Sequence, residues 1–151
     1  MADLVAYYSR SPASGFYVLD YNGKSLGLIG LDANVPAQAG SKSKAKSTET
    51  ALVRHFFIEE PYRGTGIEED LLEYAVSRAF TSKTPPQRIQ MLVNDLQPYR
   101  KTAAKAANFH PVTVWDNSKG PKEWKAGIYQ WQNTWLEINK DEWKSSEEED
   151  K

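Results

Sequence analysis

The pattern of apolar and polar residues along the chain predicts a mixed α/β fold. Residues 16–21 and 26–31 are rich in apolar, β-branched and aromatic side chains, and Asn22-Gly23 lies between them. Two strand-like runs around Asn-Gly predict a β-hairpin. Gly27 and Gly30 interrupt the second run, so we expect a bulge or a close backbone approach there.

The clearest helix is predicted over 67–80, after a strand over 50–58 that is apolar enough to lie inside the sheet. We assign its acidic residues, including Glu68, Glu69 and Asp70, to the polar face. The opposite face is apolar at helical spacing: Ile67, Leu71, Leu72, Ala75, Val76, Ala79 and Phe80.

The second half of the chain continues this alternation. We expect a strand over 88–93, a short Ala-rich helix over 99–107 that stops at Asn108, a strand over 110–115 and a strand-rich segment over 126–138. Strand–helix–strand units need crossover connections, so part of the sheet is predicted to be parallel.

The chain is predicted to form one domain over residues 1–140, followed by an acidic tail over 141–151. Residues 34–48 have no apolar period and contain alternate lysines, so we interpret them as a flexible loop. A basic contact for nucleic acid or an acidic protein is the alternative for Lys42–Lys46. Residues 116–123 are interpreted as a turn region.

Composition narrows the function classes. The chain has 151 residues, a net charge of -1 and no cysteine, which excludes disulfides, a thiolate nucleophile and a Cys-ligated zinc site. Two histidines, His55 and His110, are too few for a His-rich metal site, and we expect no metal. We expect no nucleic-acid partner, no membrane segment and no signal peptide. An intracellular protein, cytoplasmic or nuclear, is predicted.

The candidate chemistry lies where the strand over 50–58 passes into the helix over 67–80. The loop Arg63-Gly64-Thr65-Gly66 joins them. The first turn of a helix carries unpaired N–H groups and a partial positive charge, both of which favour an anion. Glycine lets the backbone approach a phosphate, and Arg63 adds a positive charge. Gly-Lys-Ser/Thr is missing, which excludes an NTPase P-loop.

This loop resembles the motif of the GNAT family of acetyl-CoA-dependent N-acetyltransferases, Gln/Arg-x-x-Gly-x-Gly/Ala. Residues Arg63 to Ile67 supply its first five positions, after an apolar strand that ends at Ile58. The element order after Phe16 also matches, so the resemblance covers most of the chain. It implies an α/β fold with a mixed central sheet of GNAT-like, acyl-CoA N-acyltransferase topology. The N-terminal strand and helices of the family are shortened to residues 1–15.

The resemblance also implies where acetyl-CoA binds. Backbone groups of Phe57 and Ile58 would bind the pantetheine arm. Parallel strands that end near Ile58 and Val93 would splay apart to admit it. The activity implied is direct transfer of acetyl to a primary amine. The backbone N–H groups of the following residues would wrap the pyrophosphate: Arg63, Gly64, Thr65, Gly66, Ile67 and Glu68.

The chain departs from the family in the cofactor-binding motif and at the general acid. Glu68 stands where the motif has Gly or Ala, and Ala104 falls at the family's tyrosine general acid. Tyr99 is a candidate acid by a different geometry, and a core aromatic is the alternative. For the general base we select His55, which has a near-neutral reference pKa. A purely structural role for His55 is an equal alternative.

Several features leave the function and partners open. Glu59 and Glu60 are further candidates for the base, and they would suit a cationic acceptor. The acceptor itself is not specified by the sequence, and a homodimer remains open. The alternative function is a degenerate GNAT-like domain that binds CoA or a partner protein without turnover. Exposed tryptophans would mark such a surface, but we expect most of the five to lie in the core (Trp115, Trp124, Trp131, Trp135 and Trp143).

Overall fold

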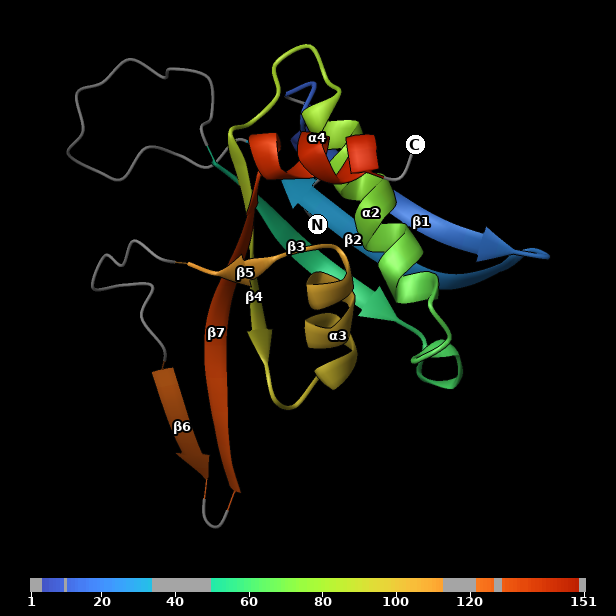
Figure 1. The fold of residues 1–151 in the computed structure, drawn as a ribbon. Coiled ribbons are helices and arrows are strands. Elements are labelled where there is room, and N and C mark those ends of the chain that lie inside the picture. The colour runs from blue at the N-terminus through green and yellow to red at the C-terminus, as the bar shows by residue number, and fades with distance from the viewer. Residues whose placement is uncertain (1–3, 10, 34–49, 113–121, 127–128, 150–151) are drawn as a thin grey trace.

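The computed structural model describes residues 4–9, 11–33, 50–112, 122–126 and 129–149. Within these ranges one mixed sheet has the strand order β1-β2-β3-β4-β7-β5, with β6 also paired to β7 (Figure 1). The pairing β3–β4 is parallel and the other pairings are antiparallel. The mixed α/β prediction is therefore confirmed.

The elements follow the expected order of strands and helices, with helix α1 added before it, helix α4 added after it, and three strands in place of two after α3. The strands are β1 Gly15–Tyr21, β2 Lys24–Asp32, β3 Thr50–Ile58, β4 Arg88–Asn94, β5 His110–Pro111, β6 Lys122–Ala126 and β7 Tyr129–Asn139. The helices are α1 Leu4–Tyr8, α2 Ile67–Phe80, α3 Pro98–Ala106 and α4 Lys140–Glu149, with a short 3-10 helix η1 at Glu60–Tyr62.

The predicted hairpin and its glycine contacts are confirmed. Asn22 and Gly23 have φ values of 51° and 78°, the left-handed turn that joins antiparallel strands. In β2, a Cβ at Gly27 would lie 2.9 Å from the carbonyl oxygen of Phe57. The register of β2 against β3 shifts between Leu28 and Gly30.

Helices α2 and α3 lie side by side on one face of the sheet (Figure 1). The apolar face of α2 packs onto that sheet face with Ile29 and Leu31 of β2. The next residue along, Gly30, approaches the hydroxyl of Tyr8, so α1 packs on the opposite face. The two faces follow from the alternation of side chains along a strand.

Three expectations are wrong. Residues 140–149 form helix α4 in place of an acidic tail that begins at residue 141, because Trp143 packs against Phe80 with ring centroids 5.4 Å apart. Lys122 belongs to β6, so the turn region ends earlier than expected and the strand-rich segment is a hairpin. Glu68 does not lie on the polar face of α2, since its residue is only 2% exposed.

Some expectations fall outside the described residues: the loop over 34–48, most of the turn region over 116–121, and Trp115. Among the other tryptophans, Trp143 packs against the core and Trp135 is half-buried. The strand expected over 110–115 is described as His110–Pro111. In the described ranges no helix is long and apolar enough to cross a membrane.

Candidate functional site

A gap between β3 and β4 defines the candidate site. The strands pair in parallel only where Thr50, Ala51 and Leu52 meet Arg88, Ile89 and Gln90. Beyond this short ladder the carboxyl halves of the strands diverge (Figure 1). The splay expected between strands that end near Ile58 and Val93 is present.

A bulge in β3 accompanies the divergence. His55 has a φ of 54°, and the pairing of β3 with β2 skips there from Arg54 to Phe57. The extra residue exchanges the faces of the strand, since Ala51 and then Phe56 and Ile58 are buried. Beyond the bulge the carboxyl end of β3 remains paired with β2 up to Ile58 but is no longer paired with β4.

The loop after β3 presents unpaired backbone donors. Gly64 and Gly66 have φ values of 80° and 95°, and a Cβ at either would meet no atom within 4 Å. In the ranges that the structure covers, the backbone N–H groups of Thr65 to Glu69 have no protein acceptor. Such a row of donors at the start of a helix is suited to a phosphate group.

Glu68 folds back into this loop. Its Oε1 accepts a hydrogen bond from the backbone N–H of Gly64 at 2.8 Å. Its Oε2 is buried and has no hydrogen-bond partner. The loop therefore already holds one anionic group, which belongs to the protein itself.

Arg63 closes the end of the gap. The Nε of Arg63 donates to the carbonyl oxygen of Ile58 at 2.8 Å. Its guanidinium carbon lies 4.5 Å from the ring centroid of Tyr99 and 5.4 Å from that of Phe57. Arginine stacks readily on aromatic faces, so this side chain is held in place from several sides.

A cavity of about 420 Å³ opens beside the loop. Glu60, Arg63, Gly64 and Glu68 line it from the loop, and Leu96 to Tyr99 with Thr102 line it from the start of α3. It lies against the end of β3, because its lining residue Arg63 is bonded to Ile58. The loop, the strand end and the first turn of α3 thus surround one cavity.

The overall structure is similar to those of solved acetyltransferases. An acetyltransferase of the GNAT family from Streptococcus pneumoniae is similar with a TM-score of 0.67 and 18% identity, over 89% of this chain and 71% of that one. For yncA, an acetyltransferase from Salmonella typhimurium solved with acetyl-CoA, the TM-score is 0.66 and the identity 13%, over 92% of this chain and 72% of that one. An N-acetyltransferase from Staphylococcus aureus Mu50 is similar with a TM-score of 0.62 and 16% identity, over 84% of this chain and 68% of that one.

The chain has the GNAT acetyltransferase fold. The resemblance seen in the loop sequence is thereby confirmed at the level of the fold. No protein-family model matches the sequence, and no curated protein matches it.

The GNAT fold places the candidate acid at the cavity. Tyr99 lines the cavity, although its residue is only 7% exposed. Its hydroxyl oxygen accepts from the Nε of Arg100 at 3.4 Å, and its ring meets Phe56 edge-on. Ala104, at the position of the family's tyrosine, is fully buried and faces the core.

Of the candidate bases His55, Glu59 and Glu60, only Glu60 is among the described residues that line the cavity. His55 is exposed at the bulge and does not line the cavity. Arg54 pairs with the fully buried Asp32 at 3.3 Å, so it is held on the strand as an ion-pair partner. Glu59 is 3.6 Å from the Nζ of Lys24, whereas Glu60 lines the cavity.

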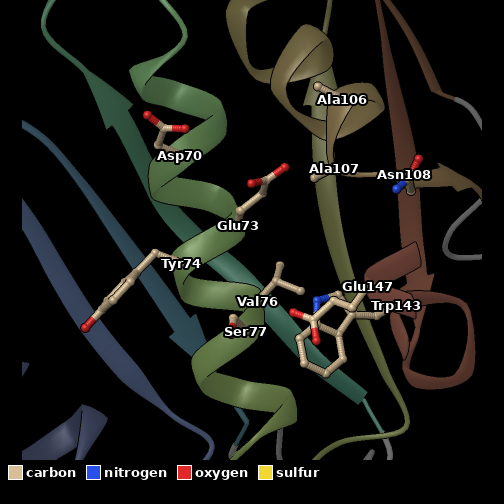
Figure 2. A pocket seen from close by; sticks show the side chains of 10 residues that line it. All are labelled: Asp70, Glu73, Tyr74, Val76, Ser77, Ala106, Ala107, Asn108, Trp143 and Glu147. Atoms are coloured by element: carbon tan, nitrogen blue, oxygen red, sulfur yellow. The ribbon is translucent and has the colours of Figure 1, made fainter. Parts of the chain in front are cut away.

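A second cavity, of about 510 Å³, is lined by residues of α2, the end of α3 and α4 (Figure 2). Helix α2 lines one side of it, and the end of α3 with Trp143 and Glu147 of α4 line the other. Asp70, Glu73 and Glu147 make its rim acidic. The loop residues Arg63 to Glu68 do not reach it, so it is separate from the candidate cofactor site.

Sequence reasoning missed the internal contacts of the loop. The stacking of Arg63 between Phe57 and Tyr99 joins residues from separate elements, and nothing in the local pattern signals it. The signal for Glu68 was present in the departure from the motif, because a side chain stands where the family has none. The direction of that side chain was decided only by the fold.

Proposed function

We propose that this chain is an acetyl-CoA-dependent N-acetyltransferase that acts on a primary amine. The observation that supports it is the row of unpaired N–H groups from Thr65 to Glu69 beside the gap between β3 and β4. In this proposal an extended arm lies between the diverging ends of β3 and β4, and the row of donors binds a diphosphate. Solved proteins with the same fold are named as an acetyltransferase of the GNAT family and as an N-acetyltransferase.

We infer that acetyl-CoA binds to the backbone around the gap. In our proposal Phe57 and Ile58 hold the pantetheine arm through backbone groups. The diphosphate is held by the loop residues Arg63, Gly64, Thr65, Gly66, Ile67 and Glu68, through their N–H groups. Existing hydrogen bonds oppose this binding: Arg63 Nε donates to Ile58 O, the Arg63 N–H donates to the Glu60 carbonyl oxygen at 3.2 Å, and the Glu68 carboxylate occupies the Gly64 N–H.

The chemistry follows from what an amide bond requires. The bound thioester supplies the acetyl group. The acceptor nitrogen must give up a proton, for which we propose His55, and the leaving sulfur gains one, for which we propose Tyr99. Because the Tyr99 oxygen accepts from Arg100, its own hydrogen remains available for donation. Glu60 at the cavity would favour a cationic acceptor.

A second candidate is a degenerate GNAT-fold domain that binds CoA or a partner protein without turnover. The observation that favours it is Ala104, which leaves the position of the family's general acid without a hydroxyl group. If the degenerate domain binds CoA, both proposals predict binding of the cofactor, and they differ only in whether the acetyl group is transferred. Both can therefore be tested on one set of proteins.

The test is calorimetric titration of acetyl-CoA into the chain and into an Arg63→Ala, Gly66→Glu variant. We expect micromolar binding by the chain and at least tenfold weaker binding by the variant, about 1.4 kcal/mol or more. Arg78→Ala, at the other end of α2, is the matched control and should bind as the unchanged chain does. Absence of binding by the unchanged chain would refute the cofactor assignment.

An amine screen then separates enzyme from binding module. Free thiol release from acetyl-CoA is measured against polyamines, lysine peptides and protein N-termini. Turnover that falls in both Tyr99→Phe and His55→Ala, with unchanged acetyl-CoA affinity, would support the enzyme. Binding without turnover for every amine would favour the degenerate domain.

A further inference from the structure

The side chain of Glu68 occupies the loop that we assign to the diphosphate. Its carboxylate is bonded to the Gly64 N–H at 2.8 Å, and the residue is 2% exposed. Its neighbours Glu69 and Asp70 remain on the accessible side of the helix. Glu68 is thus the one acidic residue of this first turn that is directed into the loop.

We propose that Glu68 is an internal competitor of the diphosphate. Its carboxylate fills the loop in the free protein, and an acyl-CoA binds only when this side chain is displaced. The inference rests on the proposed function, since it concerns the same loop. It adds that the affinity for acyl-CoA is set by a residue of the chain and is lower than the backbone alone would give.

Physical chemistry explains why a carboxylate settles there. The start of α2 carries a partial positive charge, and the N–H of Gly64 points to the same place. A bound diphosphate would be attracted by the same features. Two anionic groups in one small loop repel each other, so the carboxylate and the diphosphate exclude each other.

The carboxylate of Glu68 lacks part of its hydrogen bonding, so a ligand can displace it. Oε1 has its partner, but Oε2 is buried without one. A buried carboxylate oxygen without a hydrogen bond is costly. A ligand that bonds Gly64 N–H and the free donors of Thr65 to Glu69 would replace this partial set of bonds by a fuller one. The closed and open loops are therefore alternative states of one site.

Arg63 supports the same interpretation from the strand end. Its Nε occupies the carbonyl oxygen of Ile58, which our proposal assigns to the pantetheine arm. Its guanidinium carbon lies 5.4 Å from the ring centroid of Phe57 and 4.5 Å from that of Tyr99, at the end of β3. The side chains of Arg63 and Glu68 therefore occupy Ile58 O and Gly64 N–H, the two backbone groups that our proposal assigns to the pantetheine arm and the diphosphate.

The experiment compares Glu68→Gln, Glu68→Ala and the control Glu69→Gln with the unchanged chain. Glu68→Gln removes the charge and retains the shape, and Glu68→Ala removes both. Glu69→Gln makes the same change one residue further along the helix. Dissociation constants are measured by calorimetry for acetyl-CoA and for S-acetylpantetheine, which has no diphosphate. Melting curves establish that each variant is folded.

We expect acetyl-CoA to bind about tenfold more tightly to Glu68→Gln, and at least as tightly to Glu68→Ala, because one like-charge contact is removed. Glu69→Gln should stay within about twofold of the unchanged chain. Binding of S-acetylpantetheine should be the same in all four proteins. If Glu68→Ala does not fold, Glu68→Gln decides the matter.

The outcomes separate this inference from the proposed function. If the unchanged chain binds acetyl-CoA and both Glu68 variants bind no more tightly, the inference fails and the proposed function stands. Equal gains for S-acetylpantetheine would also overturn it, since the effect would not lie at the diphosphate. Binding by the Glu68 variants alone would support it and would show that the native loop is closed to the cofactor. Binding by none of the proteins would refute both.

Discussion

The contact between Gly27 and the end of β3 gives a quantitative test of the fold beside the candidate site. A Cβ added at Gly27 would lie 2.6 Å from Cδ1 of Ile58 and 2.9 Å from the carbonyl oxygen of Phe57. Both distances are well below ordinary van der Waals contact. The methyl of Ile58 can move, but the Phe57 oxygen belongs to the backbone of β3, so the strand itself must shift.

We expect Gly27→Ala to lower the free energy of unfolding by about 1–2 kcal/mol. Overpacking a well-packed site costs about 1–3 kcal/mol, and the reduced entropy of the unfolded chain returns about 0.4–1 kcal/mol. For a chain of this size the change corresponds to about 3–6 °C in melting temperature. Urea denaturation measures it directly, and the m-value should be unchanged if the native fold is retained.

A double-mutant cycle locates the clash. Ile58→Val lacks Cδ1 and alone costs about 0.5–1.5 kcal/mol. In the Ile58→Val background, Gly27→Ala should cost less than in the native chain, and the remainder belongs to the Phe57 oxygen. A cost below about 0.3 kcal/mol in the native chain, or the same cost in both backgrounds, would refute the packing argument.

Three further predictions concern the loop and helix α4. Gly66 has a φ of 95° and open space around it, so Gly66→Ala should cost about 1–2 kcal/mol from strain alone and Gly66→Asn less; equal costs in urea denaturation would contradict this. Trp143→Ala should lower the free energy of unfolding by about 2–3 kcal/mol, because it removes the packing on Phe80. Ser145→Ala on the same helix is the control, and a smaller loss of melting temperature for Trp143→Ala than for Ser145→Ala would contradict the packing of α4 on the core. Burial by itself lowers the pKa of His110, but its hydrogen bonds to Glu142 and to the Pro111 carbonyl, together with the nearby negative charges of Glu142 and Glu137, raise the pKa overall from 6.5. Burial by itself raises the pKa of Glu142, and its hydrogen bonds to Asn139 and His110 together with the charge of His110 lower it overall from 4.5. The ion pair should therefore stabilise the fold most between pH 4.5 and pH 6.5, and this stabilisation should be lost as pH rises through the folded pKa of His110 or falls through that of Glu142. Because both side chains are about half exposed, the pair should contribute only about 0.5 kcal/mol. The measurement is the difference in unfolding free energy between the unchanged chain and Glu142→Gln, which should be about 0.5 kcal/mol at pH 5.5 and about 0 at pH 9.

The elements of the fold were predictable where short-range patterns decide them. The left-handed φ values at Asn22 and Gly23 follow from residues that tolerate them, and Asn108 ends α3 with a φ of 65° as expected. Helix α2 has the predicted bounds because its apolar residues recur at 3.6-residue spacing. Helix α4 was missed, because only Trp143 contributes an apolar contact to a segment that otherwise reads as acidic and polar.

The candidate site was predictable in part. The glycines of the loop and the parallel strands beside it were expected from the motif and the element order, and both are present. The roles assigned to His55 and Tyr99 stay predictions. The position of Glu68 was expected on the polar face of α2, and that expectation was wrong because the loop offers the carboxylate the Gly64 N–H.

The sequence by itself determined which segments are strands and helices, where the hairpin turns, and where a loop with left-handed glycines opens a helix. These features depend on residue spacing and on backbone angles, which neighbouring residues decide. Only the tertiary structure decided that β3 and β4 separate, that Arg63 lies between Phe57 and Tyr99, and that Glu68 turns into the loop. Those features depend on contacts between segments distant along the chain or on which hydrogen-bond donors the folded backbone leaves free, and both are defined only when the sheet and its helices are assembled.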